Sequence, residues 1–167
     1  MDFNLPKEID AYRKQIRNFV DEHILPLENN PSNFDEHESI VLPLLTELRE
    51  RARSEGIWAL QVSKERGGGG LPVVGMAACY EEMGRSLYAP AVFNSHAPDD
   101  GNMMLLEKVA TNLQKDRWLQ PLIDGESWSA FAMTEPAPGS GSDPGGMMQT
   151  RAEKIGNQWK YMVASGL

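Results

Sequence analysis

Apolar residues recur at helical spacing through most of the chain. Between Pro6 and Pro26 they return every three or four positions, which is the period of one face of an amphipathic helix. Pro6 suits the first helical position and Pro26 marks the end, because proline lacks a backbone N–H and restricts the residue before it. The pattern predicts a helix of about five turns, with an apolar face made of Ile9, Tyr12, Ile16, Phe19, Val20 and His23.

The same period predicts further helices over about 39–55, 72–88 and 101–110, and another that begins at Thr111 and ends near Leu122. Thr111 and Gln114 have the spacing of a capping box. Three arginines fall near the end of the 39–55 helix, where the helix dipole favours cations, and are expected to form a solvated helix end: Arg49, Arg51 and Arg53. The expected apolar faces include Leu42, Val73, Val74, Leu87 and Trp118.

From Trp128 onward short segments replace helices. Residues 129–133 are few and small or apolar, which favours a buried strand, and Pro136 is expected to end it. Apolar and polar positions alternate in period two over 149–155 and 159–164, on either side of a Gly-Asn pair, which predicts a β-hairpin.

The chain is therefore expected to be mainly α. We expect an all-α bundle over residues 1–127 and an incomplete β-domain over residues 128–167. Two or three strands expose their edges and cannot close a sandwich by themselves, so the second part is expected to be the truncated start of a larger β-domain.

Composition narrows the classes of partner. Sixteen basic and 24 acidic residues give a net charge of −8, which argues against nucleic acid or an anionic membrane as the main partner. No apolar run approaches the roughly 20 residues that span a bilayer, and the N-terminus has neither a signal peptide nor a transit peptide pattern. These features favour a soluble, cytoplasmic protein.

The chain offers no constellation for a metal or a disulfide. It has one cysteine, Cys79, which lies among apolar neighbours and is expected to be a core thiol. The three histidines, His23, His37 and His96, lack the spacing of metal ligands, and His23 is expected to have a structural role.

Two other patterns resemble functional sites, a phosphate-binding loop and a catalytic carboxylate pair, but lack the features that such sites require. Gly67–Gly70 is followed by Leu-Pro and lacks the Gly-Lys-Ser/Thr of a phosphate-binding loop. Glu81 and Glu82 are adjacent on a predicted helix, so they point about 100° apart and cannot flank one substrate bond. Both glutamates are expected at the surface or in ion pairs.

The loop after Thr134-Glu135-Pro136 is a better candidate. Its glycines let the backbone approach a ligand closely, and its hydroxyl and N–H groups can face an anion. An apolar strand edge that leads into such a loop suits a planar, phosphate-bearing cofactor. A simple turn is the alternative interpretation of the same residues.

Three blocks of sequence resemble the acyl-CoA dehydrogenase family. The first comprises residues 56–69 and the following Tyr-Glu-Glu-Met-Gly-Arg-Ser of residues 80–86. The second is Gln-Lys-Asp-Arg-Trp-Leu-Gln-Pro-Leu-Ile-Asp-Gly-Glu, residues 114–126, and the third is Phe-Ala-Met-Thr-Glu-Pro with the Gly-Ser-Asp that follows, in Phe131–Asp143. The blocks occur in the family's order and, with the leading helix, cover nearly the whole chain.

The resemblance implies a fold and an activity. The fold would be the family's N-terminal helical domain plus the start of its middle β-domain. The full enzyme would be a homo-oligomer that uses FAD to remove two hydrogens across Cα–Cβ of an acyl-CoA thioester and passes the electrons to an electron-transferring flavoprotein. A glutamate would take the α-proton while the flavin accepts the β-hydride, so base, carbonyl donors and flavin must converge.

The resemblance also implies roles for individual residues. Phe131, Ala132, Met133 and Thr134 would line the flavin, with the Thr134 hydroxyl and N–H facing the polar edge of the ring. Gly141 and Ser142 would approach the FAD pyrophosphate, and Ser142 would also border the acyl-CoA. The family has about two residues fewer between Thr-Glu-Pro and Ser-Asp, so Ser140 is an alternative to Ser142.

No residue of this chain is expected to be the catalytic base. In the family the base belongs to the C-terminal helical domain, and a flavin-contacting strand would begin after Gly166. We therefore expect an N-terminal piece of a dehydrogenase that is not catalytically competent alone. A non-catalytic helical interaction module, or other flavin chemistry such as oxidase or monooxygenase activity on the same fold, stays open as an alternative.

Overall fold

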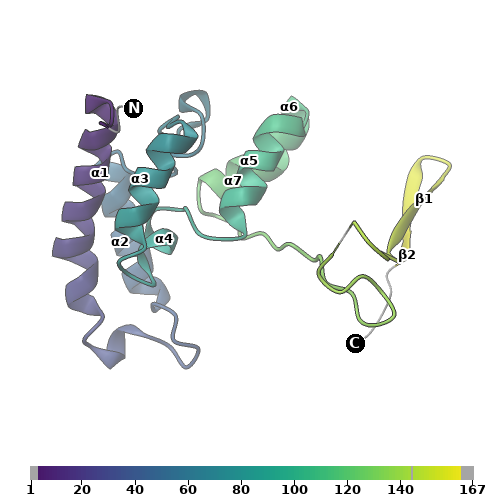
Figure 1. Cartoon of the computed structure of the whole chain (residues 1–167), viewed down its shortest axis with the longest axis horizontal. Helices are drawn as coiled ribbons and strands as arrows, with labels where there is room; N and C mark the ends of the chain where they lie inside the picture. The colour runs from purple at the N-terminus through teal and green to yellow at the C-terminus, as the bar shows by residue number, and fades with distance from the viewer. Residues whose placement is uncertain (1–3, 144, 163–167) are drawn as a thin grey trace. The chain divides into compact units, whose positions relative to one another are not determined.

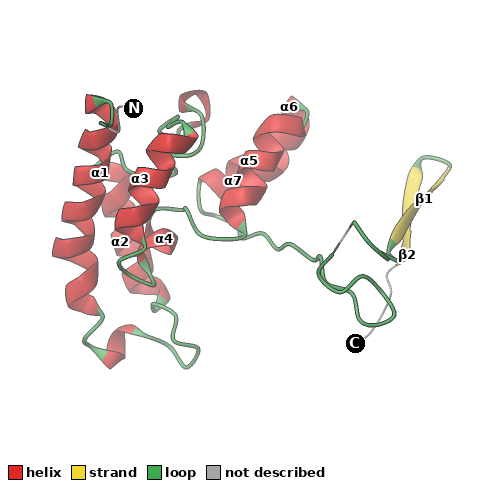
Figure 2. Ribbon diagram, viewed as in Figure 1, coloured by secondary structure: helices red, strands yellow, loops and turns green. Residues whose placement is uncertain are grey.

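The computed structural model describes residues 4–143 and 145–162 and divides the chain into two compact units, Met1–Ser129 and Ala130–Leu167 (Figure 1). The sequence prediction placed the boundary between residues 127 and 128. The first unit is helical and the second holds an antiparallel pair of strands, as Figure 2 shows. The prediction of a mainly α chain that ends in a β-hairpin is confirmed.

The helices of the first unit correspond to the predicted ones, except for α4, which the periodicity does not predict. They are α1 (Lys7–Phe19), α2 (Leu42–Ser54), α3 (Val73–Met83), α4 (Ala89–Val92), α5 (Asp99–Val109), α6 (Asn112–Gln114) and α7 (Gln120–Ile123). One π-helical stretch, Val20–Ile24, extends α1, and a second, Lys115–Leu119, joins α6 to α7. Pro6 caps α1 instead of starting it. The capping box of Thr111 and Gln114 is confirmed by both of its hydrogen bonds.

Two groups of buried side chains hold this unit together. In the larger one α1 lies beside α3, close to α2 and α4 (Figure 1). Its fully buried members include Phe19 and Phe93, whose rings meet edge to face at 5.2 Å, and Cys79, whose thiol pKa burial raises to about 11. The smaller group packs the region of α5 and α7 around Trp58, Ala59, Val62, Met103, Leu119, Leu122 and Ile123. The core-thiol prediction for Cys79 is therefore confirmed.

Several residues that were assigned to apolar faces are exposed. Leu42 is the first residue of α2, and Val73 and Val74 are the first two of α3, so they lie at helix ends and not along packed faces. Leu87 lies beyond the end of α3 at Gly84 and is 91% exposed. Trp118 is also exposed, in the π-helical stretch where the turn departs from the 3.6-residue period.

One of the three arginines of α2 also differs from the prediction. Arg49 is buried, and its Nε donates a hydrogen bond to the Ala91 carbonyl at 3.1 Å. The Arg53 guanidinium lies 3.7 Å from the centroid of the Trp58 ring. Arg51 and Arg53 are both exposed near the end of the helix, and the Arg51 guanidinium lies 3.0 Å from the ring nitrogens of His23. The idea of a solvated helix end is therefore wrong for Arg49, because aromatic faces and a carbonyl take the place of water.

The glycine run serves packing. A Cβ on Gly69 would lie 2.5 Å from Cδ2 of Leu60. The Gly68 N–H donates to the Ser63 carbonyl at 3.0 Å, and the Gly70 N–H donates to the Val62 carbonyl at 2.7 Å. Because these glycines lack side chains, the chain packs closely against the turn at residues 59–62. Their N–H groups donate to backbone carbonyls of the protein and are not free to bind a phosphate. The interpretation that rejects a phosphate loop agrees with this geometry.

The second unit is built from β1 (Arg151–Ile155) and β2 (Gln158–Met162), which pair antiparallel with Ile155 opposite Gln158 and Arg151 opposite Met162. The predicted hairpin is confirmed over these residues, while residues 163–164 of the predicted second strand lie outside the described residues. The buried strand predicted at 129–133 is wrong. Those residues form no strand in the described chain, and Phe131 is 65% exposed.

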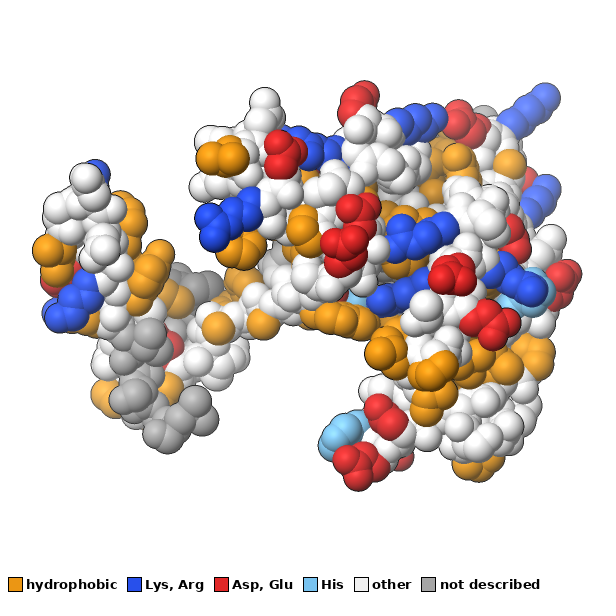
Figure 3. Space-filling model, turned by 180° about the vertical axis from the view of Figure 1, so that it is seen from behind, with side chains coloured by type: hydrophobic (Ala, Val, Ile, Leu, Met, Phe, Trp, Pro, Cys, Tyr) orange, Lys and Arg blue, Asp and Glu red, His pale blue; other side chains and the backbone are white. Residues whose placement is uncertain are grey.

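Charges of both signs lie interspersed over the helical unit on the face shown in Figure 3. Among the residues that the structure describes, no helix has the length and apolar character needed to cross a bilayer. Glu82 is buried and pairs with Arg13 at 2.9 Å, Arg17 at 3.3 Å and Arg85 at 3.6 Å. The prediction that Glu82 is ion-paired is confirmed, and its neighbour Glu81 is exposed.

We predict that Glu82→Gln lowers the free energy of unfolding by about 2 kcal/mol, because three arginines lose their shared counter-charge. This is less than the ~3–5 kcal/mol of a fully buried pair, since the arginines are partly solvated. Urea denaturation followed by circular dichroism measures the change. Glu81→Gln is the matched control and should leave stability unchanged; equal loss in both variants would contradict the role of the ion pairs.

Candidate functional site

The residues around Thr134 and Ser142 form a small closed loop in the second unit. Glu135 and Gly141 make an isolated antiparallel bridge, in which the Glu135 N–H donates to the Gly141 carbonyl at 2.9 Å. The bridge places the residues on its outer side next to each other, and the hydroxyls of Thr134 and Ser142 are 3.0 Å apart. The structure therefore brings together two residues that the sequence assigned to one site.

Glycine is required inside this loop. The Gly139 N–H donates to the Pro136 carbonyl at 2.7 Å, and a Cβ on Gly139 would lie 2.6 Å from Oε2 of Glu135. Gly141 has a φ of +60°, a conformation that favours glycine, and open space where its Cβ would be. The loop is tight at Gly139 and open at Gly141, so a ligand can approach the backbone at Gly141.

The side chain of Glu135 is buried beneath this loop. Its Oε2 accepts from the Gln149 N–H at 2.8 Å and its Oε1 from the Thr150 N–H at 2.7 Å. Hydrogen bonds from the Gln149 backbone, and next from the Thr150 side chain, lower the pKa of Glu135 to about 2, against the opposing effect of burial. Sequence reasoning did not single out this residue, because nothing local shows that its carboxylate reaches residues 14 and 15 positions later.

The remaining predicted residues present an open surface. Phe131, Ala132, Thr134 and Ser142 are exposed, while Met133 and Gly141 are half-buried. The hydroxyl of Ser140, in contrast, is buried without a hydrogen-bond partner among the described residues. Of the two serines considered for the same role, Ser142 therefore offers its hydroxyl outward, next to that of Thr134.

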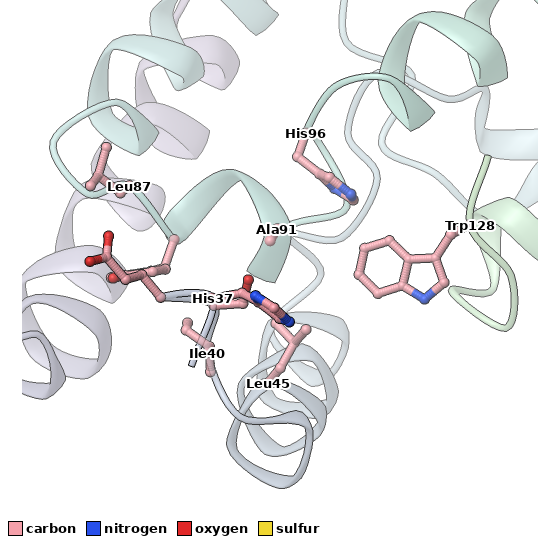
Figure 4. A pocket seen from close by; sticks show the side chains of 10 residues that line it. His37, Ile40, Leu45, Leu87, Ala91, His96 and Trp128 are labelled. Atoms are coloured by element: carbon pink, nitrogen blue, oxygen red, sulfur yellow. The ribbon is translucent and has the colours of Figure 1, made fainter. Parts of the chain in front are cut away.

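The first unit contains a separate cavity of about 470 Å³ (Figure 4). Its walls are mainly apolar and include Ile40, Leu45, Ala91 and Trp128, with the imidazoles of His37 and His96 at the lining. Burial lowers the pKa of His96, and its Nδ1 is buried without a partner among the described residues. Sequence reasoning missed this cavity, because its lining comes from loops and helix ends far apart in the chain.

A polar cluster beside the cavity holds the last residues of the helical unit. Asp99, at the first position of α5, accepts from the Ser129 N–H at 2.6 Å and from the Ser129 hydroxyl at 2.5 Å. Its other oxygen lies 3.2 Å from Nε2 of His96. The Trp128 ring lies over the Arg49 guanidinium, 4.7 Å from centroid to Cζ. The point at which the chain leaves the helical unit is thus held by a carboxylate and a cation–π contact.

No group of three or more His, Cys, Asp or Glu side chains that could hold a metal ion occurs within residues 4–143 and 145–162. The described residues offer hydroxyl and backbone hydrogen bonding near Thr134 and Ser142, and an apolar cavity in the first unit.

Comparison with known proteins identifies relatives. The family model "Acyl-CoA dehydrogenase, N-terminal domain" matches residues 6–126. Acyl-CoA dehydrogenase family member 10 of Mus musculus is 40% identical over 133 residues, which are 74% of this chain and 12% of that protein.

Solved structures show the same fold. A Mycobacterium abscessus structure assigned to the acyl-CoA dehydrogenases is 35% identical with a TM-score of 0.71, covering 81% of this chain and 36% of that one. A glutaryl-CoA dehydrogenase of Mycobacterium smegmatis in complex with FADH2 shares the fold at 22% identity, with a TM-score of 0.64, covering 93% of this chain and 37% of that one. The chain thus spans between 12% and 37% of the length of these three proteins.

We predict that Asp99→Ala lowers the free energy of unfolding of the helical unit by about 2 kcal/mol, because a buried carboxylate accepts two hydrogen bonds from Ser129. Ser129→Ala should cost less, and the double variant should lose less than the sum of the two. A double-mutant cycle in urea measures this coupling. Asp116→Ala, which breaks an exposed ion pair with Arg66, is the control and should have little effect; strict additivity of Asp99 and Ser129 would contradict the contact.

We also predict that the loop around Glu135 loses order in acid. The folded-state pKa is about 2 and the ordinary value is 4.5, so the stabilising contribution of Glu135 is complete above pH 4.5 and is lost as the pH falls through 2. Amide NMR signals of Gln149 and Thr150 recorded from neutral pH to pH 2 should report the change. Because Asp10, Asp21 and Asp35 of the helical unit also have lowered pKa values, the test is the difference from Glu135→Gln, which should lack this transition.

Proposed function

The chain belongs to the acyl-CoA dehydrogenase family, and from this premise we propose that it forms part of an FAD-dependent enzyme that introduces a double bond between Cα and Cβ of an acyl-CoA thioester. The pairing of Thr134 with Ser142 at 3.0 Å carries the proposal. In this proposal residues 128–167 are the beginning of the family's middle β-domain.

The cofactor would contact the outward side of the loop. Phe131, Ala132, Met133 and Thr134 would line the flavin, and Thr134 would offer its hydroxyl and N–H to the polar edge of the ring. FAD, when bound, supplies the acceptor of the hydride. The fit rests on the exposure of the Thr134 and Ser142 hydroxyls and on the open space beside Gly141.

The phosphate and substrate contacts would lie at the other end of the loop. Gly141 and Ser142 would approach the pyrophosphate, and Ser142 would also border the acyl-CoA. A glycine without neighbours at its Cβ position suits close approach of a phosphate to the backbone. The buried hydroxyl of Ser140 makes Ser142 the better candidate of the two serines for this role.

The two glutamates that are buried among the described residues, Glu135 and Glu82, are unsuited to act as the base. Glu135 has a pKa of about 2 and its oxygens already accept backbone hydrogen bonds, so it has little affinity for a substrate proton at neutral pH. Glu82 is held by three arginines. We infer that the base is supplied by a part of the enzyme outside this chain, and that the full enzyme is a homo-oligomer that passes its electrons to an electron-transferring flavoprotein.

We predict that the chain binds FAD and that Thr134→Ala weakens binding up to about 10-fold, the equivalent of one hydrogen bond of ~0.5–1.5 kcal/mol. Titration followed by flavin fluorescence and visible absorbance measures the affinity. Thr46→Ala, on α2, is the matched control and should bind as the wild type does. Failure of the wild-type chain to bind FAD would count against the proposal and in favour of a helical interaction module.

A further inference from the structure

One side chain joins three segments of the second unit. Glu135 ends the segment that carries Phe131–Thr134, and its backbone N–H bonds to Gly141 across the loop. Its carboxylate reaches the N–H groups of Gln149 and Thr150, which lead directly into β1. Main chain and side chain of the same residue thereby tie the loop to the hairpin.

The carboxylate is well placed to hold this arrangement. Each of its oxygens accepts a backbone N–H, at 2.8 and 2.7 Å, and charged acceptors make stronger hydrogen bonds than neutral ones. Glu135 is 6% exposed although most of its surroundings in this unit are exposed, so its side chain faces protein and not solvent. Gly139 packs so closely against it that a Cβ would meet Glu135 Cβ at 2.8 Å.

The position of Glu135 determines which side chains lie outward. The bridge pairs Glu135 with Gly141. Thr134, just before Glu135, therefore lies opposite Ser142, just after Gly141, and both side chains are exposed. Besides the bridge and the buried carboxylate, the path of loop 136–141 is defined among the described residues by a turn hydrogen bond from the Gly139 N–H to the Pro136 carbonyl. The distance between the two hydroxyls therefore depends on a residue that itself offers no atom to a ligand.

We propose that Glu135 is a positioning residue that holds the hydroxyls of Thr134 and Ser142 side by side and so preorganises the loop for its cofactor. The proposal rests on the proposed function for the identity of that cofactor, FAD. Glu135 acts through Thr134 and Ser142, since it orders the loop that carries their hydroxyls before the cofactor binds. Order that exists in advance removes the entropy cost of ordering the loop on binding.

The test uses Glu135→Gln, which keeps the shape and one acceptor oxygen but turns the other end into a donor that faces an N–H group. Two measurements are made on the whole chain: NMR contacts between the side chains of Thr134 and Ser142 without ligand, and the affinity for FAD. Glu153→Gln, an exposed glutamate of β1, is the matched control. Cross-strand contacts between Glu153 and Lys160 in the Glu135→Gln variant verify that the hairpin is still formed.

We expect Glu135→Gln to lose the Thr134–Ser142 contact, to weaken FAD binding about 10-fold, and to add little to the loss caused by Thr134→Ala, because both changes act on the same hydroxyl pair. A preserved Thr134–Ser142 contact in Glu135→Gln, or a loss of affinity that adds fully to that of Thr134→Ala, overturns the inference. If the wild-type chain binds no FAD and Glu135→Gln still separates the two hydroxyls, the proposed function fails and the positioning role of Glu135 stands.

Discussion

The buried carboxylate of Glu135 is the interaction on which the second unit depends. A two-stranded hairpin is marginally stable by itself, and the side chains of β1 and β2 are almost all exposed, so packing contributes little there. Charge-assisted hydrogen bonds to backbone N–H groups at Gln149 and Thr150 replace that missing packing. The exposed surface at Thr134 and Ser142 follows from this interior contact.

The helical unit is stabilised in a different way. Its core consists of aromatic and aliphatic side chains from α1 to α4, joined to a second group around α5 and α7. Three charged residues buried in it meet partners: Glu82 pairs with arginines, Arg49 lies against Trp128 and the Ala91 carbonyl, and Asp99 contacts Ser129 and His96. This agrees with the general rule that a buried charge is tolerated only with pairing or hydrogen bonds.

In the proposed dehydrogenase, the two units offer different groups to the ligands. The second unit presents hydroxyl and backbone groups that suit a polar ring and a phosphate, and the buried carboxylate of Glu135 is too acidic to remove a proton at neutral pH. The helical unit contributes an apolar cavity and a firm end point at Trp128 and Ser129. In the proposed function, this chain binds and orients the cofactor and the substrate, and another part of the enzyme removes the proton.

Features that depend on neighbours in sequence could be read from the sequence alone. The helices, the capping box of Thr111 and Gln114, and the hairpin around Gly156 follow from periodicity and turn chemistry, which act over a few residues. The resemblance in residues 131–142 singled out Thr134 and Ser142. The tertiary structure alone decided that these two hydroxyls meet, that Glu135 is buried beneath them, that Arg49 lies under Trp128, and that residues 129–133 form no buried strand. The physical reason is that burial and pairing of a side chain depend on what the rest of the chain brings to it, and no local pattern contains that information.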